Sequence, residues 1–150
     1  MTGCFWPWMM TYSRSRKSRK KKVIKTMWRY FNPNPVAARE EDCAIRAVCA
    51  ALGISWDDAF DLIAENAKQM GATMARDAAW GSVLRQHGFK KEIIPNTCPD
   101  CYSAEDFCRD NPVGIFVLGF GGHTACVIDG CLLDTWCSLE EIPIYVWYKP

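Results

Sequence analysis

The dipeptide Asp129-Gly130 lies between two apolar runs, and it constrains the fold of this chain more than any other feature of the sequence. Asp-Gly suits the two-residue turn of a β-hairpin, because both turn positions need positive φ angles. We therefore predict two strands, over residues 123–128 and 131–136. With Asp129-Gly130 as the whole turn, Ile128 pairs with Cys131.

In this register the side chain of His123 faces Trp136 across the hairpin. Asp134 lies diagonally opposite His123 on the same face, because side chains alternate between the two faces of a strand. The Asp134 carboxylate can then reach the imidazole and fix its tautomer and orientation. A one-residue bulge would turn Asp134 to the other face, so this prediction depends on the register.

A second pattern places Cys43 in the first turn of a helix. Apolar residues recur at helical spacing from Ile45 to Leu52, and Gly53 ends the segment. Unpaired backbone N–H groups at a helix N-terminus stabilise a thiolate and can donate to an oxyanion. The acidic residues 40–42 suit a helix start but oppose a low thiol pKa. The thiolate would therefore need a cationic partner.

His123 is the candidate for that partner, and the chain has only one other histidine. Cys43, His123 and Asp134 would then form a nucleophile, base and orienting acid. The alternative is a structural role for each, since buried cysteines and satisfied histidines are common in cores. His87 ends an amphipathic segment just before Gly88, and we interpret it as a structural residue at a helix C-terminus.

Several segments of the chain resemble small papain-like cysteine peptidases, above all a group found in bacteriophages and gut Firmicutes. The segments are Asn32-Pro33-Asn34-Pro35, Asp42 to Ala47, Ile94 to Tyr102, Gly122-His123, and Val127 to Gly130 leading to Asp134-Thr135-Trp136. More distantly, the pattern is similar to bacteriocin-processing peptidases and to NlpC-type and transglutaminase-like enzymes. The resemblance covers about residues 28–149.

The resemblance implies a papain-like fold with Cys43 as nucleophile, His123 as base and Asp134 as orienting acid. It also implies an oxyanion hole that includes the backbone amide of Cys43. The peptidase branches usually carry a Gln a few residues before the cysteine, and residues 36–42 contain none. Asn34 is the candidate substitute for that second oxyanion donor, with Asn32 as another choice.

Length and hydrophobic content fit one folded domain of the α+β class. The chain has 150 residues, of which 49% are hydrophobic, enough to bury a core. Capping patterns predict helices that begin after Ser55 and Ser103, and a further helix is expected over residues 77–87. Further strands are expected over residues 89–94, 113–118 and 144–148. Helices thus come first and an antiparallel sheet follows, with the nucleophile helix packed on the sheet.

Charge divides the chain into two unlike parts. Residues 14–25 hold eight of the 18 basic residues and no acid, so residues 1–26 carry a charge of +8 and residues 27–150 a charge of −7. The basic segment fits a disordered arm that could contact nucleic acid or an anionic surface, although the interpretation without a partner is favoured. We also hypothesise that Met27 is the true start, with residues 27–150 as the domain.

Nine cysteines are too few for a disulfide scaffold, and no secretory signal or membrane-length apolar run is present in the sequence. A reducing cytoplasm is therefore the expected location. Cys98-Pro-Asp-Cys101 could hold zinc or act in redox exchange, but no second ligand pair follows. We favour incidental thiols and expect no metal and no cofactor.

Three functions fit the sequence. The first is a cysteine hydrolase that cuts a peptide or isopeptide bond through an acyl-enzyme, with a peptide or protein as substrate. The second is transglutaminase-like acyl transfer to an amine on the same fold. The third is a non-catalytic interaction protein, such as a phage factor that binds a host protein. Selective alkylation of Cys43 would separate the first two functions from the third.

Overall fold

A computed structural model describes residues 27–38, 41–95 and 101–150. In this part of the chain, four helices and a six-stranded mixed sheet form an α+β fold. The helices are α2 (Cys43–Leu52), α3 (Trp56–Met70), α4 (Asp77–Gln86) and α5 (Ala104–Asp110), and the strands are β1 (Trp28–Tyr30), β2 (Lys90–Ile93), β3 (Ile115–Phe120), β4 (His123–Ile128), β5 (Cys131–Asp134) and β6 (Tyr145–Tyr148).

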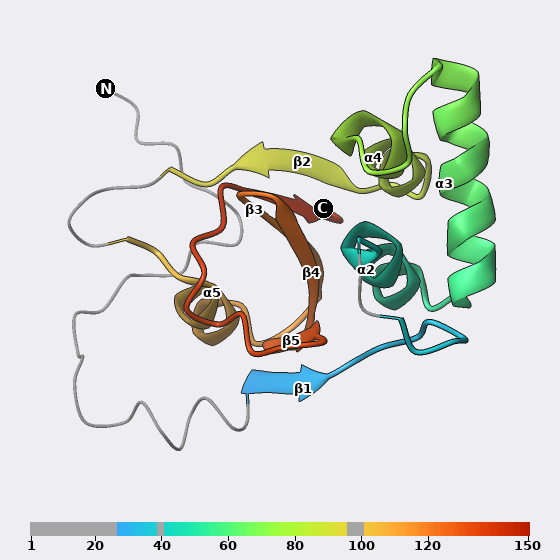
Figure 1. Ribbon diagram of the computed structural model, residues 1–150. Helices are drawn as coiled ribbons and strands as arrows, with labels where there is room; N and C mark the ends of the chain where they lie inside the picture. Colours follow the sequence, from blue (N-terminus) through green and yellow to red (C-terminus); the bar gives the residue numbers. More distant parts are fainter. Residues whose placement is uncertain (1–26, 39–40, 96–100) are drawn as a thin grey trace, which may run out of the picture.

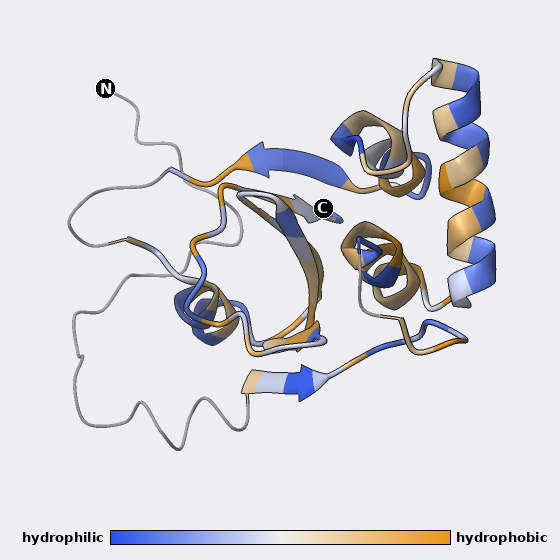
Figure 2. Cartoon of the chain, in the orientation of Figure 1, coloured by the Kyte–Doolittle hydropathy of each residue, from blue (hydrophilic) through white to orange (hydrophobic). Residues whose placement is uncertain are grey.

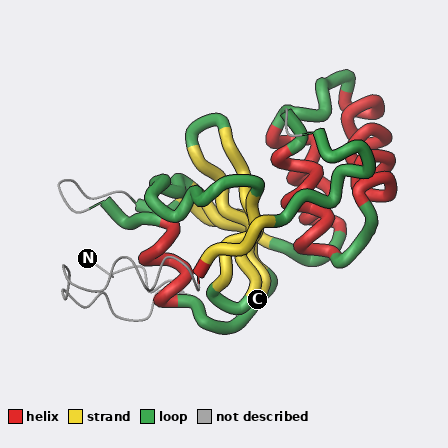
Figure 3. The backbone as a smooth tube through the Cα atoms, turned by 60° about the horizontal axis from the view of Figure 1, so that its bottom comes forward, coloured by secondary structure: helices red, strands yellow, loops and turns green. Residues whose placement is uncertain are grey.

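The sheet separates two groups of helices. Helices α2, α3 and α4 cover one face, and α5 lies in the concave side of the curved sheet on the other face (Figure 1). A second view shows the strands as a middle layer between these groups (Figure 3). The order of strands is β1-β5-β4-β3-β6-β2, so β4 and β3 are central and β1 and β2 are edges.

Alternation along the central strands builds a core on each face. In β3, Phe116 and Leu118 pack into the core around α5, whereas Val117 packs into the core around α2 and α4. Side chains of a strand point to opposite faces in turn, so one strand supplies both cores. The central strands are accordingly apolar and the exposed edge strand β2 is polar (Figure 2).

The predicted hairpin is confirmed in its register. Strands β4 and β5 pair with Ile128 opposite Cys131, and Asp129 and Gly130 both have positive φ angles, of 48° and 73°. The Asp129 carboxylate also accepts a hydrogen bond from the backbone of Gly114 at 2.9 Å. The turn therefore fixes the register without a bulge in the paired residues.

Helix ends follow the predicted signals. Helix α2 begins at Cys43 and stops at Gly53, whose φ of 65° is left-handed and whose N–H donates to the carbonyl of Cys49. Ser55 caps α3 by accepting from the N–H of Asp58, and Ser103 forms a full capping box at α5. His87 is the C-cap of α4, as expected. None of the described helices is long and apolar enough to cross a membrane.

Three details of the predicted sheet are wrong. Strand β1 was not foreseen, and it pairs with β5 in parallel, so the sheet is mixed and not purely antiparallel. Strand β3 runs from Ile115 to Phe120, two residues later than predicted, because Gly119 continues the strand and does not end it. Strand β5 ends at Asp134, two residues earlier than predicted, so Trp136 lies beyond the paired residues of the hairpin.

The side chain of a neighbouring strand occupies the space beside Gly119. A Cβ placed at Gly119 would lie 2.0 Å from the ring of Tyr145 on the adjacent strand. The Tyr145 ring therefore lies directly over the backbone of β3, and its position depends on the missing side chain.

We predict that Gly119→Ala lowers the free energy of unfolding by about 1–3 kcal/mol, because the methyl group must displace the Tyr145 ring. Gly121→Ala is the matched control, since no atom lies within 4 Å of a Cβ at that position. Denaturant unfolding of both variants measures the difference. Equal stabilities would contradict the close approach of Tyr145 to β3.

Candidate active site

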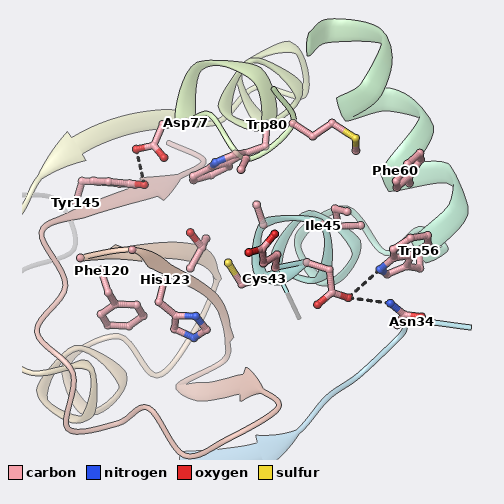
Figure 4. A pocket seen from close by; sticks show the side chains of 18 of the residues that line it. Asn34, Cys43, Ile45, Trp56, Phe60, Asp77, Trp80, Phe120, His123 and Tyr145 are labelled. Atoms are coloured by element: carbon pink, nitrogen blue, oxygen red, sulfur yellow. Dashed lines mark hydrogen bonds between the residues drawn. The ribbon is translucent and has the colours of Figure 1, made fainter. Parts of the chain in front are cut away.

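A pocket of about 890 Å³ lies where the start of α2 meets the end of β3 and the start of β4. Its lining includes Cys43, His123 and Tyr145, together with aromatic side chains from α3 and α4 (Figure 4). The start of α2 thus meets, at one pocket, a pair of strands that is about 70 residues away in the sequence. The two residues predicted to act as nucleophile and base both face it.

Cys43 and His123 interact directly. Burial alone would raise the pKa of Cys43, but a hydrogen bond to His123 and the charge of that imidazolium lower it below its ordinary range. The backbone of Thr124 and the charge of Arg46 act in the same direction. The sulfur of Cys43 points toward His123 (Figure 4). These contacts favour a thiolate–imidazolium pair.

His123 is held on its other side by Asp134. Its Nε2 lies 2.6 Å from Oδ2 of Asp134, so Nδ1 is the ring nitrogen left for Cys43. Burial opposes a charged imidazole, but the hydrogen bonds to Asp134 and Cys43 raise the pKa of His123 to about 9. The predicted diagonal of His123 and Asp134 is therefore present as a contact.

Two aromatic rings fix the plane of the imidazole. Phe120 stacks on His123 with ring centroids 5.8 Å apart, and Trp136 lies against it at 5.2 Å. Trp136 is the residue predicted to face His123 across the hairpin. Contacts with these two rings restrict the rotation of the imidazole.

Asp134 is itself held by several donors. It is only 1% exposed, and it accepts hydrogen bonds from the Ser138 hydroxyl at 2.6 Å and from the backbone N–H of Thr135 at 2.8 Å. Asp134 is therefore a buried part of the fold as well as the partner of His123, so its substitution must also affect stability.

Arg46 is a buried cation that links two carboxylates. It is 5% exposed, its Nη1 forms an ion pair with Asp42, and its Nη2 lies 3.6 Å from Oδ1 of Asp134. No role was expected for Arg46. The sequence nevertheless indicates its ion pair, because Arg46 follows Asp42 by four residues, which puts both side chains on one face of a helix.

Asp42 does not cap the helix that it precedes. Its side chain makes no capping hydrogen bond and instead binds Arg46, the indole Nε1 of Trp56 at 3.1 Å and the amide of Asn34 at 3.1 Å. Asp42 was expected to oppose a low pKa of Cys43, but it is not among the groups that shift the pKa of that thiol. Its carboxylate is instead paired with the Arg46 guanidinium.

The candidate oxyanion donors differ in how many of their hydrogen-bonding groups already have a partner. The backbone N–H of Cys43 belongs to the first turn of α2, where amides have no intrahelical acceptor. Asn34 lines the pocket, but one hydrogen of its Nδ2 is used by Asp42 and its Oδ1 accepts from the N–H of Val36. Only the second Nδ2 hydrogen of Asn34 is left for an oxyanion. Asn32 donates to the carbonyl of Ala38.

Two aromatic residues of α3 line the pocket. Trp56 and Phe60 stack at 5.2 Å on α3, and both border the hollow with Trp80 and Ile45 (Figure 4). Phe60 is 36% exposed, whereas Ala59 and Ala67 of the same helix are buried. Helical spacing identified the inward face of α3 but could not show that its edge borders a cavity.

Other thiols have a different environment. Burial raises the pKa of Cys49 and of Cys108 to about 12, which keeps both protonated. Cys137 is exposed and lies beyond the hairpin. Cys98 lies outside the described residues, as do residues 1–26 of the basic segment. Among the residues that the structure describes, no group of three or more His, Cys, Asp or Glu could hold a metal ion.

We predict that Arg46→Gln raises the pKa of the Cys43 thiol, because a cation that stabilises the thiolate is removed. Arg46→Lys keeps the charge and should keep the low pKa. The measurement is the rate of iodoacetamide alkylation at Cys43 across a pH series, read by mass spectrometry. Identical profiles for Arg46→Gln and the parent would contradict this role.

Breaking a buried ion pair costs about 3–5 kcal/mol, so the stability of Arg46→Gln must be checked by denaturant unfolding. Asp42→Asn combined with Arg46→Gln removes one buried carboxylate together with the guanidinium. This double variant keeps the pKa measurement possible if the single variant unfolds.

No protein-family model, curated protein or solved structure matches this chain.

Proposed function

We propose that this protein is a cysteine hydrolase with papain-like chemistry, which cuts a peptide or isopeptide bond through an acyl-enzyme. Cys43 is the nucleophile, His123 the general acid and base, and Asp134 the orienting acid. The observation that carries the proposal is the chain of contacts from Cys43 to Asp134: the Cys43 thiol is hydrogen-bonded to His123, whose Nε2 lies 2.6 Å from Oδ2 of Asp134. These contacts lower the pKa of Cys43 and raise that of His123 to about 9, the directions that favour the thiolate–imidazolium pair of thiol catalysis.

In the first step the Cys43 thiolate attacks the carbonyl carbon of the scissile bond. The electrons of the carbonyl move onto its oxygen, which the backbone N–H of Cys43 stabilises. Nδ1 of His123 then gives its proton to the leaving nitrogen, and the bond from carbon to nitrogen breaks. An amine leaves, and the acyl group stays on the sulfur as a thioester.

In the second step water attacks the thioester. His123, now neutral, takes a proton from the water, and the resulting hydroxide adds to the carbonyl carbon. The bond from carbon to sulfur breaks and releases a carboxylic acid and the Cys43 thiolate. The imidazolium of His123 pairs again with that thiolate, so the site returns to its starting state. Asp134 holds the ring through Nε2 in both steps.

The pocket is consistent with a peptide substrate. A volume of about 890 Å³ accommodates several residues of an extended chain. Beside Cys43 it offers aromatic and aliphatic surface from Ile45, Trp56 and Phe60, which suits an apolar side chain. Glu41 and Asp77 line the same pocket, which makes it acidic.

The first test is selective alkylation. We expect iodoacetamide at neutral pH to label Cys43 at least about tenfold faster than Cys137, because contacts with His123 stabilise the Cys43 thiolate. Cys137 is the internal reference, since it is exposed and therefore accessible. Mass spectrometry of the digested protein measures both rates.

His123→Ala is the matched variant for that experiment. It removes the cation and hydrogen bond that lower the pKa of Cys43, so labelling should fall to the rate of an ordinary thiol. If Cys43 reacts no faster than Cys137 in the parent protein, the hydrolase proposal is wrong.

The activity should depend on pH with two limbs. The reactive pair needs a deprotonated Cys43 and a protonated His123. The rate therefore rises as pH increases through the lowered pKa of Cys43 and falls as pH increases through about 9, the pKa of His123. Hydrolysis of a peptide library between pH 4 and pH 10 measures both limbs. A rate that keeps rising above about pH 9 would contradict the requirement for imidazolium.

We expect Asp134→Asn to lower the rate by orders of magnitude, because the charge that favours imidazolium is lost and the amide can select the wrong tautomer. It should also destabilise the fold, since Asp134 is buried and balances Arg46. Asp129→Asn is the control. Its side-chain oxygen can still accept from the Gly114 N–H, and Asn-Gly suits the same turn. If Asp134→Asn is as active as the parent, Asp134 has no part in the reaction and the site is a Cys–His dyad.

A further inference from the structure

A second hollow, of about 360 Å³, lies beside the active-site pocket. It is bordered by α4 from its N-cap Arg76 to Arg85 in its last turn, and by strands β2 and β6. Asp77 lines both hollows, so they meet at the start of α4. The proposed reaction makes no use of this second hollow.

The second hollow is basic. Its lining has three cationic side chains, Arg76, Arg85 and Lys91, and one carboxylate, that of Asp77, which gives a net charge of +2. None of these three cations forms an ion pair with a carboxylate in the described part of the chain. Residues 27–150 carry a charge of −7 in total, so this is a local reversal of sign.

Two of the cations are held over aromatic rings. Nζ of Lys91 lies 4.0 Å from the ring centre of Tyr145, and the guanidinium of Arg85 lies 5.4 Å from that of Trp147. A cation over an aromatic face is attracted to it and keeps its N–H donors available. Their positions are therefore restricted before a ligand binds, which lowers the entropic cost of binding.

The Trp147 ring is fixed by close packing. A Cβ at Gly81 would lie 2.6 Å from that ring, so α4 approaches β6 as closely as a helix can at this point. Asp77 is restrained in turn, because Oδ2 accepts a hydrogen bond from the Tyr145 hydroxyl at 2.9 Å. Tyr145 thus connects the two hollows: it lines the active-site pocket, and its ring contacts Lys91, which lines the basic hollow.

We propose that the basic hollow binds a carboxylate of the peptide substrate, while the scissile bond of the same peptide lies at Cys43. The carboxylate is either an acidic side chain or the carboxyl terminus of the peptide. This proposal rests on the hydrolase function proposed above and names a feature of its substrate.

The size and setting of the hollow favour this occupant. A volume of about 360 Å³ holds one or two residues, and three cations suit a single carboxylate. A nucleic acid would need an extended basic surface, whereas the adjoining pocket is acidic at Glu41 and Asp77. A peptide that crosses from the active-site pocket past Asp77 reaches the cations within a few residues.

Binding is tested with two labelled decapeptides and the Cys43→Ala protein, which cannot cleave them. One peptide alternates Glu and Gly and has an amidated carboxyl terminus, and the other alternates Gln and Gly with a free carboxyl terminus. Fluorescence anisotropy at low salt measures affinity. Tighter binding of the first peptide identifies an acidic side chain as the ligand, and tighter binding of the second identifies the carboxyl terminus.

Arg85→Gln combined with Lys91→Gln should weaken the preferred peptide at least about fivefold, as expected for the loss of two partly exposed ion pairs. Lys68→Gln combined with Lys90→Gln changes the charge equally and lies outside the hollow, so it should leave affinity nearly unchanged. Both double variants keep the basic residues 14–25. Equal weakening by the two double variants would overturn the proposal.

A protection experiment connects the two hollows. With Cys43 present, the preferred peptide should slow alkylation of Cys43 by iodoacetamide, and this protection should disappear in the Arg85→Gln and Lys91→Gln double variant. Binding that depends on Arg85 and Lys91 without any protection of Cys43 would overturn a shared ligand. Slow alkylation of Cys43 in the absence of peptide would refute the hydrolase function instead, so the two failures are distinguishable.

Discussion

The buried ion pairs of Arg46 are the interaction on which the rest of the site depends. A guanidinium cannot be deprotonated in a protein, so its burial requires carboxylates close by. Asp42 supplies one from the start of the same helix, and Asp134 supplies the other from the end of β5. Helix α2 is thereby tied to the sheet at the point where its first residue, Cys43, must meet β4.

Charge alternates along the chain of contacts that follows. The positive Arg46 lies between the negative Asp42 and Asp134. Asp134 in turn contacts His123, which contacts Cys43, and the pKa directions of these last two residues favour a positive imidazolium and a negative thiolate. Each charge lies beside an opposite one, which compensates for its removal from water. A change at any member therefore affects both folding and reactivity, because the same contacts serve both.

The surroundings of Cys43 have two unlike hollows that meet at Asp77. The larger is apolar and acidic, and the smaller is basic with an aromatic floor. Tyr145 lines the larger hollow, its ring contacts Lys91 of the smaller one, and that ring lies where Gly119 has no side chain. A single glycine in β3 thus positions a residue that borders the candidate active-site pocket and holds a cation of the other hollow.

Three local features were predictable from the order of residues: the Asp129-Gly130 turn with its register, the end of α2 at Gly53, and a thiol in the first turn of a helix. These follow from backbone preferences and from periodicity over a few residues. Three others arise from tertiary packing: the parallel pairing of β1, the exposure of Phe60 to a cavity, and the position of Arg46 between two carboxylates. Those features depend on contacts between residues far apart in the chain, which local preference cannot encode. The contact between Cys43 and His123 depends on local preferences and on tertiary packing. Local preferences place each residue in its helix or strand, but only packing of α2 on β4 brings the two side chains together.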